Sequence, residues 1–232
     1  MSNELLWILF IFLDFGISII LFRLFKKEGL LAIIVMNIIL CNIQVVKFID
    51  IFGMTATLGN LLYGGIFWAT DMLSEIYGKK VAQKGMVQGF AALFIMTVVM
   101  NFAIFFTPSS FDVMHPHIKA IFSLMPRIAI ASLIAYLISQ YHDIWAFHFW
   151  KEKTGGRHLW LRNNLSTLIS QLLDSLIFTL MAFAGTLPFS QLIQIIITTY
   201  LLKLIVAIID TPFIYIGRIL AIKMGEYFPE NR

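Results

Sequence analysis

The stretch Leu58–Lys80 reads LGNLLYGGIFWATDMLSEIYGKK, an uncharged apolar run that ends in two acids and two lysines. The acids, Asp71 and Glu75, are four residues apart, about one helical turn, so both carboxylates lie on one face of a helix. Ionisable groups at or just inside a bilayer boundary are costly, and they usually mark a pathway or a binding site. The stretch therefore predicts a membrane helix that carries a functional acid near one end.

The composition of the whole chain indicates a membrane protein. Of 232 residues, 59% are hydrophobic and only 13% are charged, and the mean hydropathy is +0.87. Soluble domains carry about 25% charged residues. The net charge of +4 comes from basic residues between the apolar runs, which fits topology signals and contact with anionic lipid better than binding to nucleic acid. We therefore expect a polytopic protein whose partners are the lipid bilayer and a small molecule, with no nucleic acid.

Spanning helices need about 20 mostly apolar residues, and seven segments meet or nearly meet this length. The predicted spans are Leu5–Phe25, Leu30–Phe52, Leu58–Tyr77, Met86–Phe106, Ile118–Tyr141, Leu165–Gly185 and Phe189–Ile222. This pattern predicts an all-α integral membrane protein with seven transmembrane helices, in a single polytopic domain that covers residues 1–232.

The connections between these spans predict the orientation. The first, third and fifth connections and the C-terminal tail carry lysines and arginines, whereas the second, fourth and sixth carry none. By the positive-inside rule the N-terminus faces out and the C-terminus faces the cytoplasm. The alternation also requires an odd number of spans.

No metal, cofactor or enzyme signature occurs in the sequence. The single cysteine, Cys41, allows no intramolecular disulfide. The five histidines fall in predicted loops or at boundaries, and the His115–His117 pair has no third ligand nearby. Nucleophile-elbow, zinc-protease and phosphate-binding glycine motifs are absent. We expect a protein without cofactors that is not an enzyme.

Seven polar residues within or at the ends of the apolar segments are the candidates for a substrate-binding site. They are Asn42, Asp71, Glu75, Arg127, Gln171, Asp174 and Lys203. Glu75 has a boundary alternative, because it precedes Lys79 by four residues in a favourable helical spacing. Asp71 lies one turn deeper, which favours a functional role.

Arg127 follows Pro126 inside the fifth predicted span. Its guanidinium stays charged, so it needs a carboxylate or an anionic or carbonyl ligand. An ion pair with Asp174 or Asp71 and a contact with the ligand are both open. Pro126 removes a backbone donor and is expected to kink this helix.

Two other pairs share a helical face. Gln171 and Asp174 are three residues apart in an unusually polar span, which indicates either a helix-packing seam or a cavity wall. The acid favours a cavity wall. Lys203 and Asp210, seven residues apart, lie on one face of the last span, where the alternative is an ion pair with Arg127 or Asp174.

The ordered set of these motifs resembles a known family, the bacterial queuosine precursor transporters of the YhhQ type, once grouped as vitamin uptake transporters. The resemblance covers about residues 30–222 and rests on Asn42, Ala69–Gly78, Pro126–Ala129, Ala135–Gln140, Ser166, Thr167, Asp174, Thr199–Lys203 and Pro212. It implies a six-helix transporter core over 30–222, and an accessory N-terminal helix within 1–29.

The resemblance also implies uptake of 7-deazaguanine bases such as preQ0, preQ1 or queuine across the inner membrane. A carboxylate of Asp71 or Asp174 would then accept the N1–H and exocyclic NH₂ donors of the base. Glu75 would suit an aminomethyl group. The O6 acceptor suits Arg127, Lys203, Gln171 or Asn42. Phe67, Trp68 and Tyr200 are the aromatic side chains that could stack on the ring.

Two alternatives from other classes stay open. A substrate-capture subunit of an energy-coupling-factor transporter also has a six-helix core. However, the second span lacks the spacing of small residues that would let a partner subunit pack closely against it. A membrane scaffold that transports nothing predicts no response to deazaguanines. A homo-oligomer is compatible with the sequence.

Overall fold

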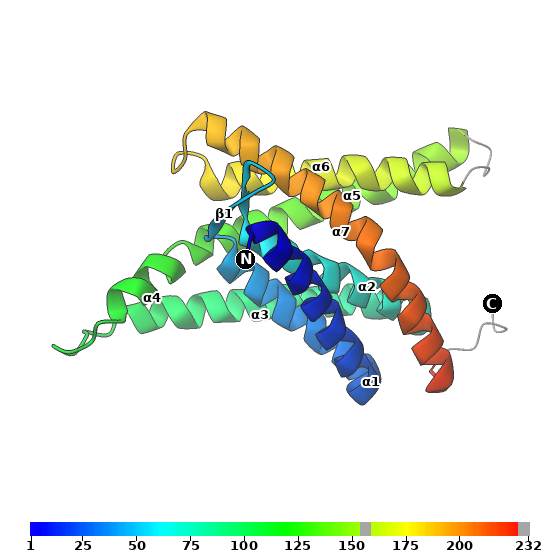
Figure 1. Ribbon diagram of the computed structural model, residues 1–232, viewed down its shortest axis with the longest axis horizontal. Helices are drawn as coiled ribbons and strands as arrows, with labels where there is room; N and C mark the ends of the chain where they lie inside the picture. The colour runs from blue at the N-terminus through cyan, green and yellow to red at the C-terminus, as the bar shows by residue number, and fades with distance from the viewer. Residues whose placement is uncertain (154–158, 227–232) are drawn as a thin grey trace.

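The computed structural model describes residues 1–153 and 159–226. Within these ranges the chain is almost entirely helical, with one short β-hairpin (Figure 1). The elements are α1 (Asn3–Gln44), β1 (Phe48–Ile51), β2 (Met54–Thr57), the 3₁₀ helix η1 (Leu58–Leu62), α2 (Tyr63–Tyr77), α3 (Lys79–Ile104), α4 (His115–Phe122), α5 (Met125–Lys153), α6 (Leu159–Phe183) and α7 (Phe189–Lys223).

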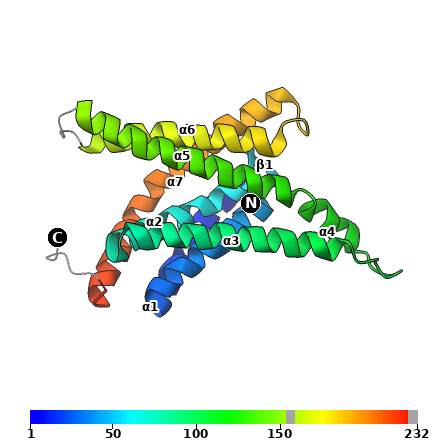
Figure 2. The same cartoon turned by 180° about the vertical axis from the view of Figure 1, so that it is seen from behind.

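The helices form two groups that α7 connects. Helices α1, α2 and α3 contact one another, and α5 and α6 lie side by side as a second group. Figure 2 shows the second group from behind, with α3 running below it. Helix α7 contacts α6 near its start and α2 further along. The space between the two groups is where the candidate site lies.

Helix α1 is a helical hairpin. Its backbone reverses at Lys26, where φ is 52° and ψ is −125°. A Cβ on Gly29 would collide with the carbonyl oxygen of Leu21, so glycine lets the two arms meet. Lys26 also pairs with Glu226 at 2.5 Å, and the Tyr77 hydroxyl donates to the same carboxylate at 2.7 Å. The hydrogen bond from Lys26 lowers the pKa of the Glu226 carboxyl.

The predicted second span, Leu30–Phe52, is wrong at its C-terminal end, because the helix stops at Gln44. The following residues form the hairpin β1–β2, a short addition to an otherwise all-α fold. Alternating apolar and polar residues in β2, Met-Thr-Ala-Thr, have strand periodicity. Phe52 and Gly53 both have positive φ, as a two-residue hairpin turn requires. Glu4 accepts the Phe52 N–H at 3.1 Å, which holds the start of α1 on this turn.

The predicted fifth span is also divided differently. Helix α4 ends at Phe122, and α5 begins at Met125 and continues to Lys153. Pro126 lies in the first turn of α5, where its missing N–H costs no hydrogen bond. It therefore starts a helix and does not kink one as the sequence predicted.

Long apolar helices confirm a membrane protein. Within the described ranges four stretches are long and apolar enough to cross a bilayer. One of them is α1, whose two arms count as a single stretch. These stretches are Asn3–Gln44, Lys79–Ile104, His115–His142 and Phe189–Lys223, with a shorter apolar helix at Leu168–Phe183. The count of seven spans and the orientation stay predictions.

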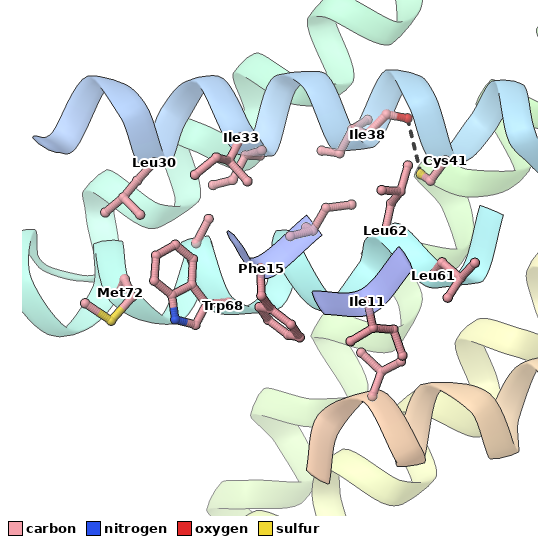
Figure 3. Close-up of a cluster of buried hydrophobic side chains, with 14 of the residues drawn as sticks. Ile11, Phe15, Leu30, Ile33, Ile38, Cys41, Leu61, Leu62, Trp68 and Met72 are labelled. Carbon is pink, nitrogen blue, oxygen red and sulfur yellow. Dashed lines mark hydrogen bonds between the residues drawn. The ribbon is translucent and has the colours of Figure 1, made fainter. Parts of the chain in front are cut away.

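The apolar core lies mainly where the arms of α1 pack on α2. Trp68 and Phe15 are completely or almost completely buried there, with Ile11 and Leu62 beside them (Figure 3). Phe15 also stacks on Phe213 of α7, with ring centroids 4.2 Å apart. A second apolar cluster lies between α5 and α6. The separate clusters agree with the two helix groups.

Candidate functional site

A partly enclosed cavity lies between the two helix groups. Its walls come from five helices, and its volume is about 90 Å³. The lining side chains are Ile38, Cys41, Asn42, Tyr63, Ile66, Phe67, Thr70, Met86, Phe90, Ser132, Tyr136, Ser139, Gln140, Gln171 and Asp174. Three of the seven candidates from the sequence, Asn42, Gln171 and Asp174, therefore line one cavity.

A buried ion pair forms one wall of this cavity. The Lys203 ammonium on α7 donates to Oδ2 of Asp174 on α6. Lys203 is 2% exposed, and its Nζ lies 4.1 Å from the ring centroid of Tyr63. The carboxylate and the aromatic face both stabilise the ammonium, which compensates for its removal from water. Lys203 thus lies directly behind two lining residues, and the pair adds no net charge to the site.

Gln171 supplies an acceptor without a donor. Its Oε1 atom is buried and has no hydrogen-bond partner in the part of the chain that the structure describes. Asp174, three residues further along α6, bonds Lys203 through Oδ2 and lines the same cavity, so its second carboxylate oxygen is a further candidate acceptor. Buried polar atoms without partners are costly. Two neighbouring acceptors on one helical face therefore predict a ligand with two neighbouring donors.

Asn42 lines the cavity and is bonded within the protein. Its Nδ2 donates to the Ile38 carbonyl at 2.7 Å, and its Oδ1 accepts from the Ser132 hydroxyl at 2.5 Å. The amide therefore connects α1 to α5 across the floor of the cavity. Its hydrogen-bonding groups are used mainly within the protein.

Aromatic rings surround the polar wall. Tyr63 and Phe67 on α2 lie 5.8 Å apart between centroids, and Phe90 on α3 lies 5.0 Å from Tyr136 on α5. Phe67 was expected among the stacking residues. Trp68 is fully buried in the core and does not line the cavity.

Asp71, Glu75, Arg127 and Lys203 do not themselves line this cavity. Lys203 reaches it through Asp174. Asp71 is exposed on α2, and Glu75 is half-buried one turn further on. A direct role of these residues in binding substrate stays a prediction.

Arg127 stabilises the end of a helix. Its Nε donates to the Met181 carbonyl at 2.7 Å, and its Nη2 donates to the Ala184 carbonyl at 2.5 Å. These carbonyls lie in the last turn of α6 and just after it, where backbone acceptors lack helical partners. The predicted ion pairs with Asp174 or Asp71 are not formed, and backbone carbonyls hold the guanidinium instead.

We expect Arg127→Gln to reduce the free energy of unfolding by about 1–3 kcal/mol, because two charge-assisted bonds to α6 are lost. Thermal unfolding in detergent would measure this as a lower Tm. Arg23→Gln is the matched control, because Arg23 is exposed on α1. Equal Tm values for Arg127→Gln and Arg23→Gln would contradict the role of Arg127 at the helix end.

The sequence reasoning missed Asp14. This acid is 7% exposed in the first arm of α1. Its Oδ2 accepts the Gly65 N–H at 2.9 Å, and its Oδ1 accepts from Asn37 Nδ2 at 2.8 Å. Gly65 lies in the first turn of α2, which has no side-chain cap of its own. Asp14 therefore acts as the missing cap, where the helix dipole favours an anion. A lone acid in an apolar run was the available signal.

The described residues contain no group of three or more His, Cys, Asp or Glu side chains that could hold a metal ion. The chemistry of the cavity is therefore that of hydrogen bonds, one ion pair and aromatic faces.

Comparison with known proteins gives two matches. A family model described as "Putative vitamin uptake transporter" matches residues 57–217. A Bacillus subtilis (strain 168) protein described as "Probable queuosine precursor transporter" is 40% identical over 219 residues, which cover 94% of this chain and 96% of that relative. No solved structure matches the chain.

Proposed function

Because the chain belongs to the family of queuosine precursor transporters, we propose that it imports 7-deazaguanine bases as a secondary carrier and binds them in the cavity next to Asp174. It is a multi-pass protein of the bacterial inner membrane. The observation that carries the site assignment is the unpartnered Gln171 Oε1 in the same cavity as the Asp174 carboxylate, one turn along α6.

The edge of the base matches these acceptors. A 7-deazaguanine presents N1–H and an exocyclic NH₂ side by side, so two donors meet two acceptors. Asp174 would take one donor in a charge-assisted bond, and Gln171 would take the other. The Lys203 ammonium orients the Asp174 carboxylate.

The rings around the cavity suit a planar ligand. Phe67 and the Phe90–Tyr136 pair come from three different helices and offer aromatic faces to a heterocycle. The cavity of about 90 Å³ is small beside the roughly 300–1,000 Å³ of typical drug-sized pockets. This size favours a free base over a nucleoside, and preQ0 or preQ1 over queuine.

Transport would require the contact between Asp174 and Lys203 to change when the base binds. When the donor edge of the base binds Asp174, it competes with Lys203 for the same carboxylate. Because Asp174 belongs to α6 and Lys203 to α7, this competition changes the contact between the two helices that border the site. Such differential contact is what a substrate needs to shift a conformational equilibrium.

Gln171→Leu tests the proposed contact. We expect the affinity for 7-deazaguanine to fall about 10- to 100-fold, because one buried hydrogen bond is lost. The affinity for 7-deazahypoxanthine, which lacks the exocyclic NH₂, should change less if Gln171 accepts that group. Calorimetry on the purified protein would measure both constants.

Gln88→Leu is the matched control, because Gln88 is exposed on α3 and does not line the cavity. Uptake of radiolabelled base by liposomes that contain only this protein would separate a carrier from a capture subunit, which needs an ATPase partner. No binding of any deazaguanine by the wild-type protein would overturn the proposed function.

A further inference from the structure

Asp210 is a buried acid that the proposed substrate site does not use. It is 6% exposed in α7 and lies seven residues after Lys203, two turns along the same helical face. Within the described ranges it has no hydrogen bond and no ion pair. A carboxylate in this position differs from Asp14 and Asp174, which are both held by donors.

The surroundings of Asp210 supply a like charge. Helix α2 packs closely on α7, since a Cβ on Gly64 would lie 2.9 Å from Val206 and one on Gly217 would lie 2.9 Å from Met72. Asp71 is exposed on this helix α2, and its negative charge acts on Asp210.

Four other charged groups on the adjoining elements have interactions of their own. From α1, Asp14 bonds Gly65 and Asn37. On α2, Glu75 lies one turn beyond Asp71. On α7, Lys203 is held by Asp174, and Arg218 lies eight residues after Asp210. Glu75 and Arg218 each have an interaction of their own.

An ionised carboxylate at this position would be expensive. Removing a charge from water without a partner costs several kcal/mol, and a second carboxylate nearby adds repulsion. A shared proton removes both costs. Pro212, two residues later, also leaves the Ile208 carbonyl without its helical donor, so α7 has a weak point next to this acid.

We propose that Asp210, facing Asp71, is the proton-binding site that couples uptake of the base to proton entry. The proton binds a carboxylate oxygen as an O–H group from the outer side and leaves to water on the cytoplasmic side, with no other bond made or broken. Lys203 connects this site to the cavity, because it contacts Asp174 and lies on the same face of α7 as Asp210. This inference rests on the proposed function.

The experiment uses the full-length protein in liposomes with the dye pyranine inside and radiolabelled 7-deazaguanine outside. Two measurements are made. Counterflow exchange at equal pH reports binding and translocation alone. Net uptake with the outside more acidic than the inside reports proton coupling. One proton per base supports up to about tenfold accumulation per pH unit. We expect the wild-type protein to accumulate the base and to acidify the lumen in step with uptake.

Asp210→Asn should keep counterflow and lose both gradient-driven accumulation and lumen acidification, because the amide cannot release a proton. Asp71→Asn should move the pH profile of uptake to lower pH, since removing the facing charge makes Asp210 bind its proton less tightly. Asp112→Asn is the control, because Asp112 is exposed between α3 and α4. It should behave as the wild type.

The outcomes separate this inference from the proposed function. Absence of wild-type counterflow would overturn the proposed function itself. If the wild-type protein shows counterflow but its net uptake does not depend on the pH gradient, only the proposed coupling site is overturned. Accumulation retained by Asp210→Asn would also overturn it. If Asp210→Asn does not fold, the wild-type pyranine signal still decides whether protons enter with the base.

Discussion

An Asp174→Asn variant is expected to bind 7-deazaguanine about 10- to 100-fold more weakly than the wild type and to lose most of its uptake. The variant loses the charge that strengthens the bond to the base, and a hydrogen bond to a charged group contributes about 1.5–3 kcal/mol. It also leaves the buried Lys203 without its counterion. Removal of one partner from a buried ion pair costs about 3–5 kcal/mol of stability.

A double variant separates these two effects. In Asp174→Asn with Lys203→Gln neither member of the buried pair is charged, so Tm should recover toward the wild-type value while base affinity stays low. Tm by thermal unfolding and affinity by calorimetry are measured on the same samples. Recovery of both quantities together would contradict a direct contact between Asp174 and the base.

Cys41 offers a second readout on the same variants. It is the single cysteine of the chain and lines the cavity, where it is 5% exposed. Its thiol donates to the Ile38 carbonyl (Figure 3). Bound base should slow the reaction of Cys41 with a small maleimide in the wild type, and it should have little effect in Asp174→Asn at the same concentration.

A Gly65→Ala substitution is expected to produce the second large effect, a clear fall in both Tm and base affinity. Its Cβ would lie 2.5 Å from Oδ2 of Asp14 and still closer to Nδ2 of Asn37. The carboxylate would have to move away from the first turn of α2, which would lose its cap. We expect a loss of about 2–4 kcal/mol in the free energy of unfolding, from a displaced charged acceptor and unsatisfied donors.

Base affinity should respond because α2 carries Tyr63 and Phe67 to the cavity, so Asp14 is a positioning residue for them. Asp14→Ala should reproduce both losses without any steric clash. Gly16→Ala is the matched control, because a Cβ at Gly16 meets nothing within 4 Å and alanine favours the helix. A Tm for Gly65→Ala equal to that of Gly16→Ala would contradict the capping role of Asp14.

Much of the helical framework was predictable, and the exceptions have identifiable causes. The long apolar run Phe189–Ile222 predicted α7 closely, because a bilayer-spanning segment must be apolar along its length, whereas α3 begins at Lys79, before the predicted Met86. The hairpin β1–β2 was missed, since Phe48, Ile49 and Ile51 are apolar enough to extend a hydropathy run although such residues also favour strands. Pro126 was assigned a kink because sequence alone does not place a helix start at the residue before it.

The candidate site was likewise predictable only in part. Gln171 and Asp174 were predicted together from a spacing of three residues, and the structure places both on one cavity wall. Arg127 could not be placed from sequence, because backbone carbonyls can bind a guanidinium as well as a carboxylate can, and every helix ends in free carbonyls. Asp14 was overlooked although it met the same criterion as the other intramembrane acids.

The sequence by itself determined that this is a membrane protein, where most of its helices lie and which polar side chains share a helical face. These properties are local, since they depend on the hydropathy and periodicity of neighbouring residues. Only the tertiary structure decided the partners: Asp174 with Lys203, Asp14 with Gly65, and Asn42 with Ser132 ninety positions away. In lipid the hydrophobic effect does not select which helix faces meet, so close packing and hydrogen bonds between distant residues make that choice.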